Sequence, residues 1–380
     1  MATQKSRRPR KGGRRGRTRG NAPLYAAVDL GTNNCRLLIA QPHGHTFRVV
    51  DSYSQIARLG EGLAATGRLS DASIDRAFSA LGKIRAKLKA RGVPNVRCIA
   101  TEACRRAENG RAFIDRVKSE LGLSFKIIGP KEEARLALIA CHNLIDASAG
   151  HVLVLDVGGG STELSLVDTS RVPQDGRVRA LVRDAAPMVA WGSLPLGVVT
   201  LFEAFPATTE AEAFALMKAH AKSVFEGWKS HAQAARALDH PAAHIIGTSG
   251  TVTCLAGVHL KLDRYRRDAV DGAWLDRAQT AEAVDLLTRL GIDGRAKLPT
   301  IGEERASLML SGCAILDAAM EVFPAPRLRV ADRGLREGLL LSMMHGEKKK
   351  RRRGGRNRTT ATADATTTAP EPEGSPSNGR

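Results

Sequence analysis

The chain has 380 residues, enough for two domains, and a formal net charge of +19. That charge suggests a nucleic-acid binder, but residues 1–22 hold nine Lys/Arg and no acid, and residues 347–380 hold nine against four acids. Residues 23–346 therefore carry only +5, so the globular part is mildly basic and its charge does not identify it as a nucleic-acid binder.

Both ends are predicted to be disordered basic tails, because they lack periodic apolar residues and cannot bury enough surface to offset chain entropy. Two interpretations stay open: solvated extensions, or tethers for RNA or another polyanion. No run approaches 18 uninterrupted apolar residues, so no membrane helix is expected. The six cysteines are widely spaced, which favours free thiols in a reducing cytoplasm.

Strands alternate with helices through the first third of the globular part, a pattern typical of α/β folds. Ser70 is the predicted N-cap of a long helix, with Asp71 in its first turn. We expect strands at 24–29, 35–40, 49–52, 96–100 and 125–128, and helices at 70–91, 111–121 and 131–145.

The second part repeats the opening of the first, with two strands flanking a glycine turn. Strands are expected at 152–156, 163–167, 187–194, 244–247 and 328–331, and helices at 209–235, after 251, at 303–322 and at 333–344. The predicted fold is α/β with two lobes, residues 23–136 and 137–346, and the last helix of the second lobe packs back on the first.

The two lobes carry the same phrase, an apolar strand that ends in Asp and runs into a glycine turn: YAAVDLGTNN from Tyr25 and HVLVLDVGGGST from His151. Glycine permits close approach of the backbone, and successive backbone N–H groups in such a turn form an anion site. Two such loops facing each other would hold a phosphate chain across a cleft. The predicted phosphate ligands are Thr32, Asn33, Gly158, Gly159, Gly160, Ser161 and Thr162.

Three acids flank these turns and form a candidate metal site. Asp29 and Asp156 end the two strands, and Glu163 begins the strand after the second turn. Mg²⁺ prefers hard oxygen ligands and is bound through one or two carboxylates together with substrate phosphates. An Asp at a strand end can also simply cap a turn. Here the Asp is repeated in both lobes, each time with a glycine turn, and this duplication favours the metal site.

The motifs DLGTNN, TEACRRA, KEEARLA, LDVGGGSTEL, GTSGTV, EERASL and ADRGLREGLL follow one another in this order. Together they resemble the exopolyphosphatase/guanosine pentaphosphate phosphohydrolase family, over roughly residues 24–345. The resemblance implies two actin-like (ribonuclease H-like) lobes with the site in the cleft between them. Larger members carry an additional helical C-terminal domain and often form homodimers; this chain looks like the short, two-domain form.

The resemblance also assigns site residues. Glu133, the second Glu of KEEARLA, matches the family's catalytic base, whereas Glu132 is expected to be solvated. Arg105, with neighbouring Arg106 as the alternative, and Arg305 match arginines expected to bind phosphate. The family implies Mg²⁺, with Mn²⁺ as a substitute. GTSGTV is either a phosphate-binding turn, with Ser249, Gly250 and Thr251 as ligands, or a tight strand-to-helix connection.

The expected function is therefore a cytoplasmic phosphoanhydride hydrolase of the stringent-response type. Water oriented by Glu133 would release the terminal phosphate of inorganic polyphosphate, or the 5′-γ-phosphate of pppGpp to give ppGpp. Two alternatives are a sugar or carboxylate kinase of the same superfold and a non-catalytic polyphosphate- or (p)ppGpp-binding regulator. The kinase needs a sugar-binding acid and an adenosine pocket, which we do not find in the sequence, and retention of Glu133 with both acid-and-glycine turns disfavours the regulator.

Overall fold

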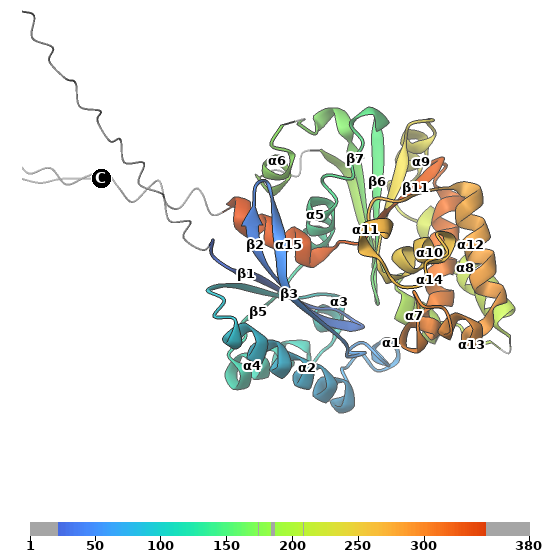
Figure 1. The fold of residues 1–380 in the computed structure, drawn as a ribbon. Helices are drawn as coiled ribbons and strands as arrows, with labels where there is room; N and C mark the ends of the chain where they lie inside the picture. Colours follow the sequence, from blue (N-terminus) through green and yellow to red (C-terminus); the bar gives the residue numbers. More distant parts are fainter. Residues whose placement is uncertain (1–21, 174, 184–186, 208, 347–380) are drawn as a thin grey trace, which may run out of the picture. The chain divides into compact units, whose positions relative to one another are not determined.

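A computed structural model describes residues 22–173, 175–183, 187–207 and 209–346. It contains a five-stranded and a six-stranded sheet, each flanked by helices (Figure 1). The predicted basic tails, 1–22 and 347–380, fall almost entirely outside the described residues. The mixed α/β class is confirmed.

The first sheet has the strand order β3-β2-β1-β4-β5. Strand β1 is antiparallel to β2 and parallel to β4, so it lies at the centre of the sheet. Its elements are β1 (Tyr25–Leu30), β2 (Asn34–His43), β3 (Thr46–Ile56), β4 (Asn95–Ala100) and β5 (Phe125–Ile127), with helices α1 (Leu63–Thr66), α2 (Asp71–Ala90), α3 (Glu102–Arg106) and α4 (Gly110–Leu121).

Helix α2 shows why these segments form helices. The Ser70 side chain accepts a hydrogen bond from the Ser73 backbone N–H at 3.2 Å, as predicted, and Asp71 follows in the first turn. Its buried residues recur at helical spacing: Ser73, Ala77, Ala80, Leu81, Ile84 and Leu88. Figure 1 shows α2 and α4 on the same face of the first sheet, where they build one hydrophobic core.

The second sheet has the order β10-β11-β9-β6-β7-β8. Its strands are β6 (His151–Val157), β7 (Thr162–Asp168), β8 (Met188–Leu194), β9 (His244–Thr248), β10 (Trp274–Asp276) and β11 (Arg327–Ala331). The helices are α5 (Pro130–Ala140), α6 (Arg177–Arg183), α7 (Val198–Ala204), α8 (Glu210–Glu226), α9 (His231–Leu238), α10 (Gly250–His259), α11 (Arg267–Val270), α12 (Arg277–Arg289), α13 (Gly291–Ala296), α14 (Glu303–Val322) and α15 (Leu335–Gly346).

Helices α5 and α15 connect the two sheets (Figure 1). They pack against each other closely enough that a Cβ on Gly338 would lie 2.0 Å from the carbonyl oxygen of Leu136. On one side, Leu136, Leu339, Leu340 and Met343 join the core of β1 and β2. On the other side, Leu138, Ile139 and Leu341 join a core beneath the second sheet. The boundary between lobes at residue 136 remains a prediction.

Two predicted helices differ from the structure. The expected 209–235 helix is divided into α8 and α9, because Gly227 ends α8 and the buried Trp228 turns the chain inward. The expected 131–145 helix ends at Ala140. Beyond it, Arg177 binds the carbonyls of His142 and Ile145, and Arg329 binds that of Leu144, so distant arginines replace the helical hydrogen bonds. Among the described residues, no helix is long and apolar enough to cross a membrane.

Candidate active site

A cleft of about 1150 Å³ is lined by residues from both sheets. The loops that reach it include the β1–β2 loop, the β6–β7 loop, the β9–α10 turn, the segment before α14 and the β11–α15 loop. Residues of β3, α3, α5, α14 and α15 also line its walls. The lining includes Asp29, Thr32, Asn33, Glu133, Asp156, Gly158, Gly159, Gly160, Ser161, Glu163, Ser249, Gly250, Thr251 and Arg305.

The β1–β2 loop is held from behind by the segment that follows β3. The Asn33 carbonyl accepts hydrogen bonds from the N–H groups of Ala57 and Arg58, both at 2.9 Å, and the Thr32 carbonyl accepts one from Gly60 at 2.8 Å. A Cβ on Gly60 would lie 2.3 Å from the Thr32 methyl group, so only glycine allows this approach. With its carbonyls engaged behind, the loop presents Thr32 and Asn33 to the cleft.

The β6–β7 loop is held by the N-terminus of α7. The carbonyls of Gly158 and Gly159 accept hydrogen bonds from Val198 and Val199, at 3.0 and 2.8 Å. Close approach again requires glycine, because a Cβ on Gly197 would lie 2.3 Å from the Gly159 carbonyl oxygen. The carbonyls of Gly158 and Gly159 thus face α7. The N–H of Gly158 donates to the Ser161 carbonyl at 2.8 Å, so an anion site in this loop would use the backbone N–H groups of other loop residues.

The two loops touch each other. A Cβ on Gly159 would lie 2.9 Å from the Thr32 Cβ and 3.2 Å from the Asn33 nitrogen. A Cβ on Gly160 would lie 2.1 Å from Glu102 Oε2, and this oxygen accepts a hydrogen bond from Thr32 Oγ1 at 3.1 Å. Both glycine turns therefore contribute to one continuous surface.

Asp156 and Glu163 face each other directly across the β6–β7 pair, as their positions on either side of the turn predict. Burial, and then other carboxylates, raise the pKa of each to about 7; for Asp156 these include Glu133 and Asp29, and for Glu163 they include Asp156. The hydroxyls of Ser161 and Ser193 donate to Glu163 Oε1 at 2.7 and 2.9 Å. Without a cation beside them, these buried carboxyl groups therefore retain their protons more readily than exposed acids do.

Glu133 lies in the first turn of α5, with its side chain 6% exposed. Burial, followed by repulsion from Glu163, raises its pKa well above the usual value, and Arg105 opposes this rise. Arg105 Nη1 donates to Glu133 Oε2 at 3.0 Å and to the Ile128 carbonyl at 2.8 Å. Arg105 is not among the residues that line the cleft.

The β9–α10 turn brings the predicted Ser249, Gly250 and Thr251 to the cleft. Ser249 caps α10 by accepting from the Val252 N–H at 3.3 Å, and its φ of 155° is a conformation that side chains rarely adopt. Such strain costs about 1–3 kcal/mol and concentrates at functional sites. Arg305 lines the same end of the cleft, with Nη1 3.7 Å from the Cys254 sulfur.

Thr162 is the predicted loop residue that the structure does not bring to the cleft. It is fully buried, and its hydroxyl donates to the Leu196 carbonyl. That bond ties the loop to the segment before α7, so its side chain supports the loop. Glu132, expected to be solvated, is half-exposed and forms a bidentate ion pair with Arg135.

Eight charged residues that the sequence did not indicate also line the cleft: Arg36, Glu102, Glu303, Glu304, Asp332, Arg333, Arg336 and Glu337. Arg36 lies directly opposite Asp29 in the β1–β2 pair, a position that strand alternation could have revealed. Burial raises the pKa of Asp29, and Arg36 and Arg336 oppose the rise. The other seven lie in motifs already noted, TEACRRA, EERASL and ADRGLREGLL.

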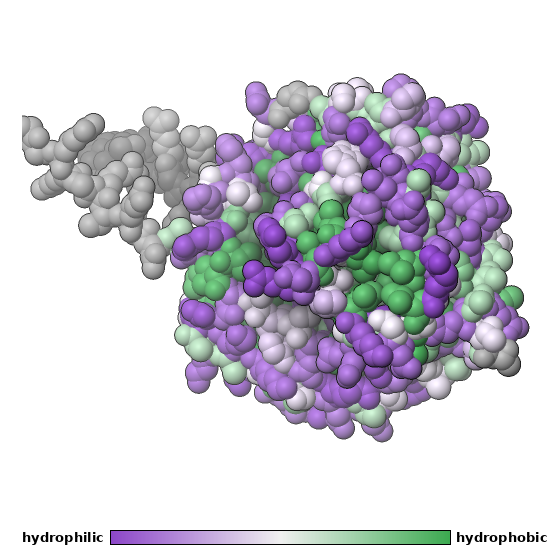
Figure 2. Space-filling view, turned by 45° about the vertical axis from the view of Figure 1, so that its right-hand side comes forward, coloured by the Kyte–Doolittle hydropathy of each residue, from purple (hydrophilic) through white to green (hydrophobic). Residues whose placement is uncertain are grey.

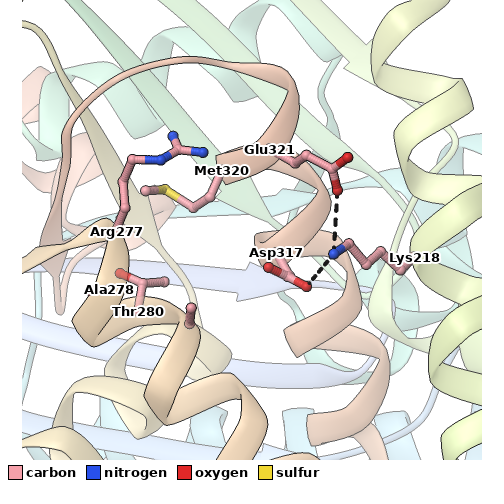
Figure 3. Close-up of a pocket in the computed structure, with 8 residues that line it drawn as sticks. Lys218, Arg277, Ala278, Thr280, Asp317, Met320 and Glu321 are labelled. Atoms are coloured by element: carbon pink, nitrogen blue, oxygen red, sulfur yellow. Dashed lines mark ion pairs between the residues drawn. The ribbon is translucent and has the colours of Figure 1, made fainter.

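A second, smaller pocket of about 370 Å³ lies between α8, α12 and α14 (Figure 3). Lys218 Nζ pairs there with Asp317 at 2.8 Å and with Glu321 at 3.3 Å. Because these charges compensate one another, the pocket offers little to an ionic ligand.

Most of the face in Figure 2 is hydrophilic, with an apolar area near its centre.

Among known protein families, the model of the Ppx/GppA phosphatase family matches residues 38–347 of the chain. The chain belongs to this family. It is 30% identical over 329 residues to a guanosine-5'-triphosphate,3'-diphosphate pyrophosphatase from Aeromonas salmonicida, covering 85% of the chain but only 60% of that relative. It is 27% identical to a putative exopolyphosphatase from Haemophilus influenzae, covering 86% of the chain and 93% of the relative.

Solved structures agree with this family membership. The Aquifex aeolicus Ppx/GppA family member is 28% identical, with a TM-score of 0.69 over 86% of this chain and 99% of that one. An exopolyphosphatase from Cytophaga hutchinsonii, at 20% identity and a TM-score of 0.74, shares the fold over 86% of this chain and 99% of that one. The Ppx/GppA fold therefore extends over the globular part of the chain.

Proposed function

We propose that this Ppx/GppA protein hydrolyses a terminal phosphoanhydride bond, releasing phosphate from inorganic polyphosphate or the 5′-γ-phosphate from pppGpp. The observation that carries the proposal is the position of Glu133. It is a buried carboxylate that lines the cleft together with Glu163 and accepts a hydrogen bond from Arg105 at 3.0 Å. The names of the relatives support both substrates, which present the same terminal group.

In the proposed reaction the backbone N–H groups of the two loops bind the terminal phosphate. Glu133 orients a water molecule and accepts its proton as the water oxygen bonds to phosphorus. The bond between phosphorus and the bridging oxygen breaks, and the remaining chain or ppGpp leaves with the electron pair. Glu133 must be ionised to act as the base, and Arg105 favours the ionised form.

The acids fit the Mg²⁺ that the family implies. Asp29 Oδ1 is buried without a hydrogen-bond partner among the described residues, and Asp156 faces Glu163 with a raised pKa. In the described part of the chain no three His, Cys, Asp or Glu are arranged to hold an ion unaided. Mg²⁺ is commonly bound through one or two carboxylates, with water and phosphate as its other ligands. We propose that one or two of the predicted acids Asp29, Asp156 and Glu163 contact it; when bound, Mg²⁺ would offset negative charge on the phosphates.

The test compares phosphate release from long polyphosphate, tripolyphosphate, pppGpp and ATP, each with Mg²⁺. We expect the Glu133→Gln variant to lose about 10²–10⁴-fold in kcat while substrate still binds, because the amide cannot accept the proton. Activity within about threefold of the parent would refute the role of Glu133. Phosphate transfer from ATP to an organic acceptor would indicate a kinase, and binding of polyphosphate without turnover would indicate a regulator.

A further inference from the structure

Two arginines and a tryptophan form a cluster outside the cleft. Arg327 and Arg329 are alternate residues of β11, so their side chains lie on the same face of the sheet. Trp274 of β10 is paired with Arg329 in the ladder. The guanidinium carbons of Arg327 and Arg329 lie 4.2 and 4.8 Å from the indole ring centre. Two like charges thus share one aromatic ring.

The positive charge of this cluster is only partly balanced. Asp146 Oδ2 lies 3.8 Å from Arg327 Nη2, at the long limit of an ion pair. Arg329 Nη1 donates to the neutral Leu144 carbonyl at 2.8 Å. The Nε atoms of both arginines are buried without a hydrogen-bond partner among the described residues. Nearby Asp271 is engaged by Arg333.

The adjacent histidine adds no charge. His244 of β9 is fully buried and meets Trp274 edge-on, with ring centres 5.0 Å apart. Burial lowers the pKa of His244 to about 4, so it is neutral at neutral pH. The cluster therefore has two guanidinium groups, one distant carboxylate and an aromatic floor, so its positive charge exceeds the negative charge beside it.

The position of the cluster relates it to the cleft. The strand that carries both arginines ends at Ala331, which lines the cleft, as do the following Asp332 and Arg333. At a rise of about 3.3 Å per residue, Arg327 lies about 13 Å along the strand from Ala331. Guanidinium groups suit phosphate oxygens, which accept several parallel N–H bonds.

We propose that Arg327, Arg329 and Trp274 form a phosphate-binding site outside the cleft, which holds a downstream part of the polyphosphate chain. The proposal rests on the proposed function, because it takes the substrate to be a phosphate polymer whose end lies in the cleft. It gives long chains a contact that tripolyphosphate and pppGpp do not reach. The cluster would therefore favour long substrates.

The test compares the full chain with Arg327→Gln and with the double variant Arg327→Gln/Arg329→Gln. The single variant keeps the hydrogen bond from Arg329 to Leu144, so it tests the site if the double variant is unstable. The matched control is Arg85→Gln/Lys89→Gln, which removes the same charge from exposed positions on α2. Binding of long-chain polyphosphate is measured by calorimetry without Mg²⁺, and turnover with Mg²⁺ is measured separately.

We expect the double variant to bind long polyphosphate about tenfold more weakly than the control, and the single variant about threefold, because partly exposed charge contacts contribute modestly. Turnover of tripolyphosphate should stay within about twofold of the parent. Equal affinities of variant and control for long polyphosphate overturn the site, as does an equal loss with tripolyphosphate. Failure of the proposed function gives a different result: the parent protein then releases no phosphate from any substrate, regardless of its affinity for polyphosphate.

Discussion

Replacing Arg105 by Gln tests whether this residue positions the proposed base or binds phosphate. Its guanidinium bonds to Glu133 at 3.0 Å and to the Ile128 carbonyl at 2.8 Å, and it is absent from the cleft lining. Gln removes the charge and keeps a polar side chain of moderate length. If Arg105 acts through Glu133, the change should alter the protonation of the base more than the affinity for substrate.

The magnitude follows from burial. The side chains of Glu133 and Arg105 are 6% and 24% exposed, so an ionised Glu133 left without this cation would cost about 3–5 kcal/mol. The carboxyl group takes up a proton instead, because burial and Glu163 already raise its pKa. A base with a higher pKa is ionised only at higher pH, so activity is lost first at low pH. Each pH unit by which the acidic limb moves corresponds to about tenfold less activity below it.

The assay is the pH dependence of kcat and kcat/KM on tripolyphosphate. We expect Arg105→Gln to move the acidic limb of kcat upward and to recover activity at high pH, with little change in KM. The matched control is Arg135→Gln, which breaks the Glu132–Arg135 pair on the same helix without touching the base. A raised KM with an unmoved limb would refute the reasoning and make Arg105 a phosphate ligand.

Three further predictions concern the acids and the glycine loops. Asp156→Asn and Glu163→Gln should each raise the Mg²⁺ concentration for half-maximal activity at least about tenfold, and an unchanged titration would contradict the metal site. Because burial and neighbouring carboxylates raise the folded-state pKa values of these acids to about 7, their own contribution to stability without divalent ions should be largest below about pH 4. It should fall as pH rises towards 7 by about 1.4 kcal/mol per pH unit for each retained proton, and a melting temperature that is flat over this range would exclude it. Gly197→Ala, which places a Cβ against Gly159, should lower kcat/KM by about 10²-fold, whereas Gly82→Ala, with open space around it, serves as the neutral control.

Local rules predicted much of the site. The cap at Ser70 and the opposition of Asp156 and Glu163 depend on neighbours within a few residues, and both are found. The sequence could not predict which group each polar side chain bonds to. Arg105, which is predicted to bind phosphate, bonds to Glu133 in the structure, and the hydroxyl of Thr162 bonds to the Leu196 carbonyl, because tertiary packing selects among donors that are equivalent in sequence.

The predicted end of the 131–145 helix was wrong for a related reason. The sequence between Cys141 and Ile145 is compatible with helix, but its carbonyls bond to Arg177 and Arg329, which lie far along the chain. The strand bearing Arg36 was predicted, yet its charge was not assigned to the cleft, because its significance comes from the partner strand. Composition and spacing thus identify the loops of the site. Which charged side chains lie opposite its acids depends on how the strands pair in the assembled sheets.

The last helix has a consequence for how the protein is made. Tyr25, Ala27 and Leu38 of the first two strands are covered by Leu339 and Met343, residues about 300 positions later. A ribosome that has synthesised the whole first sheet still holds a nascent chain whose apolar face is bare. Such long-range closure is slow, and exposed apolar surface invites aggregation in the meantime. The core on this face of the first sheet is therefore completed only once α15 has been synthesised, and we expect chains truncated before α15 to expose apolar surface.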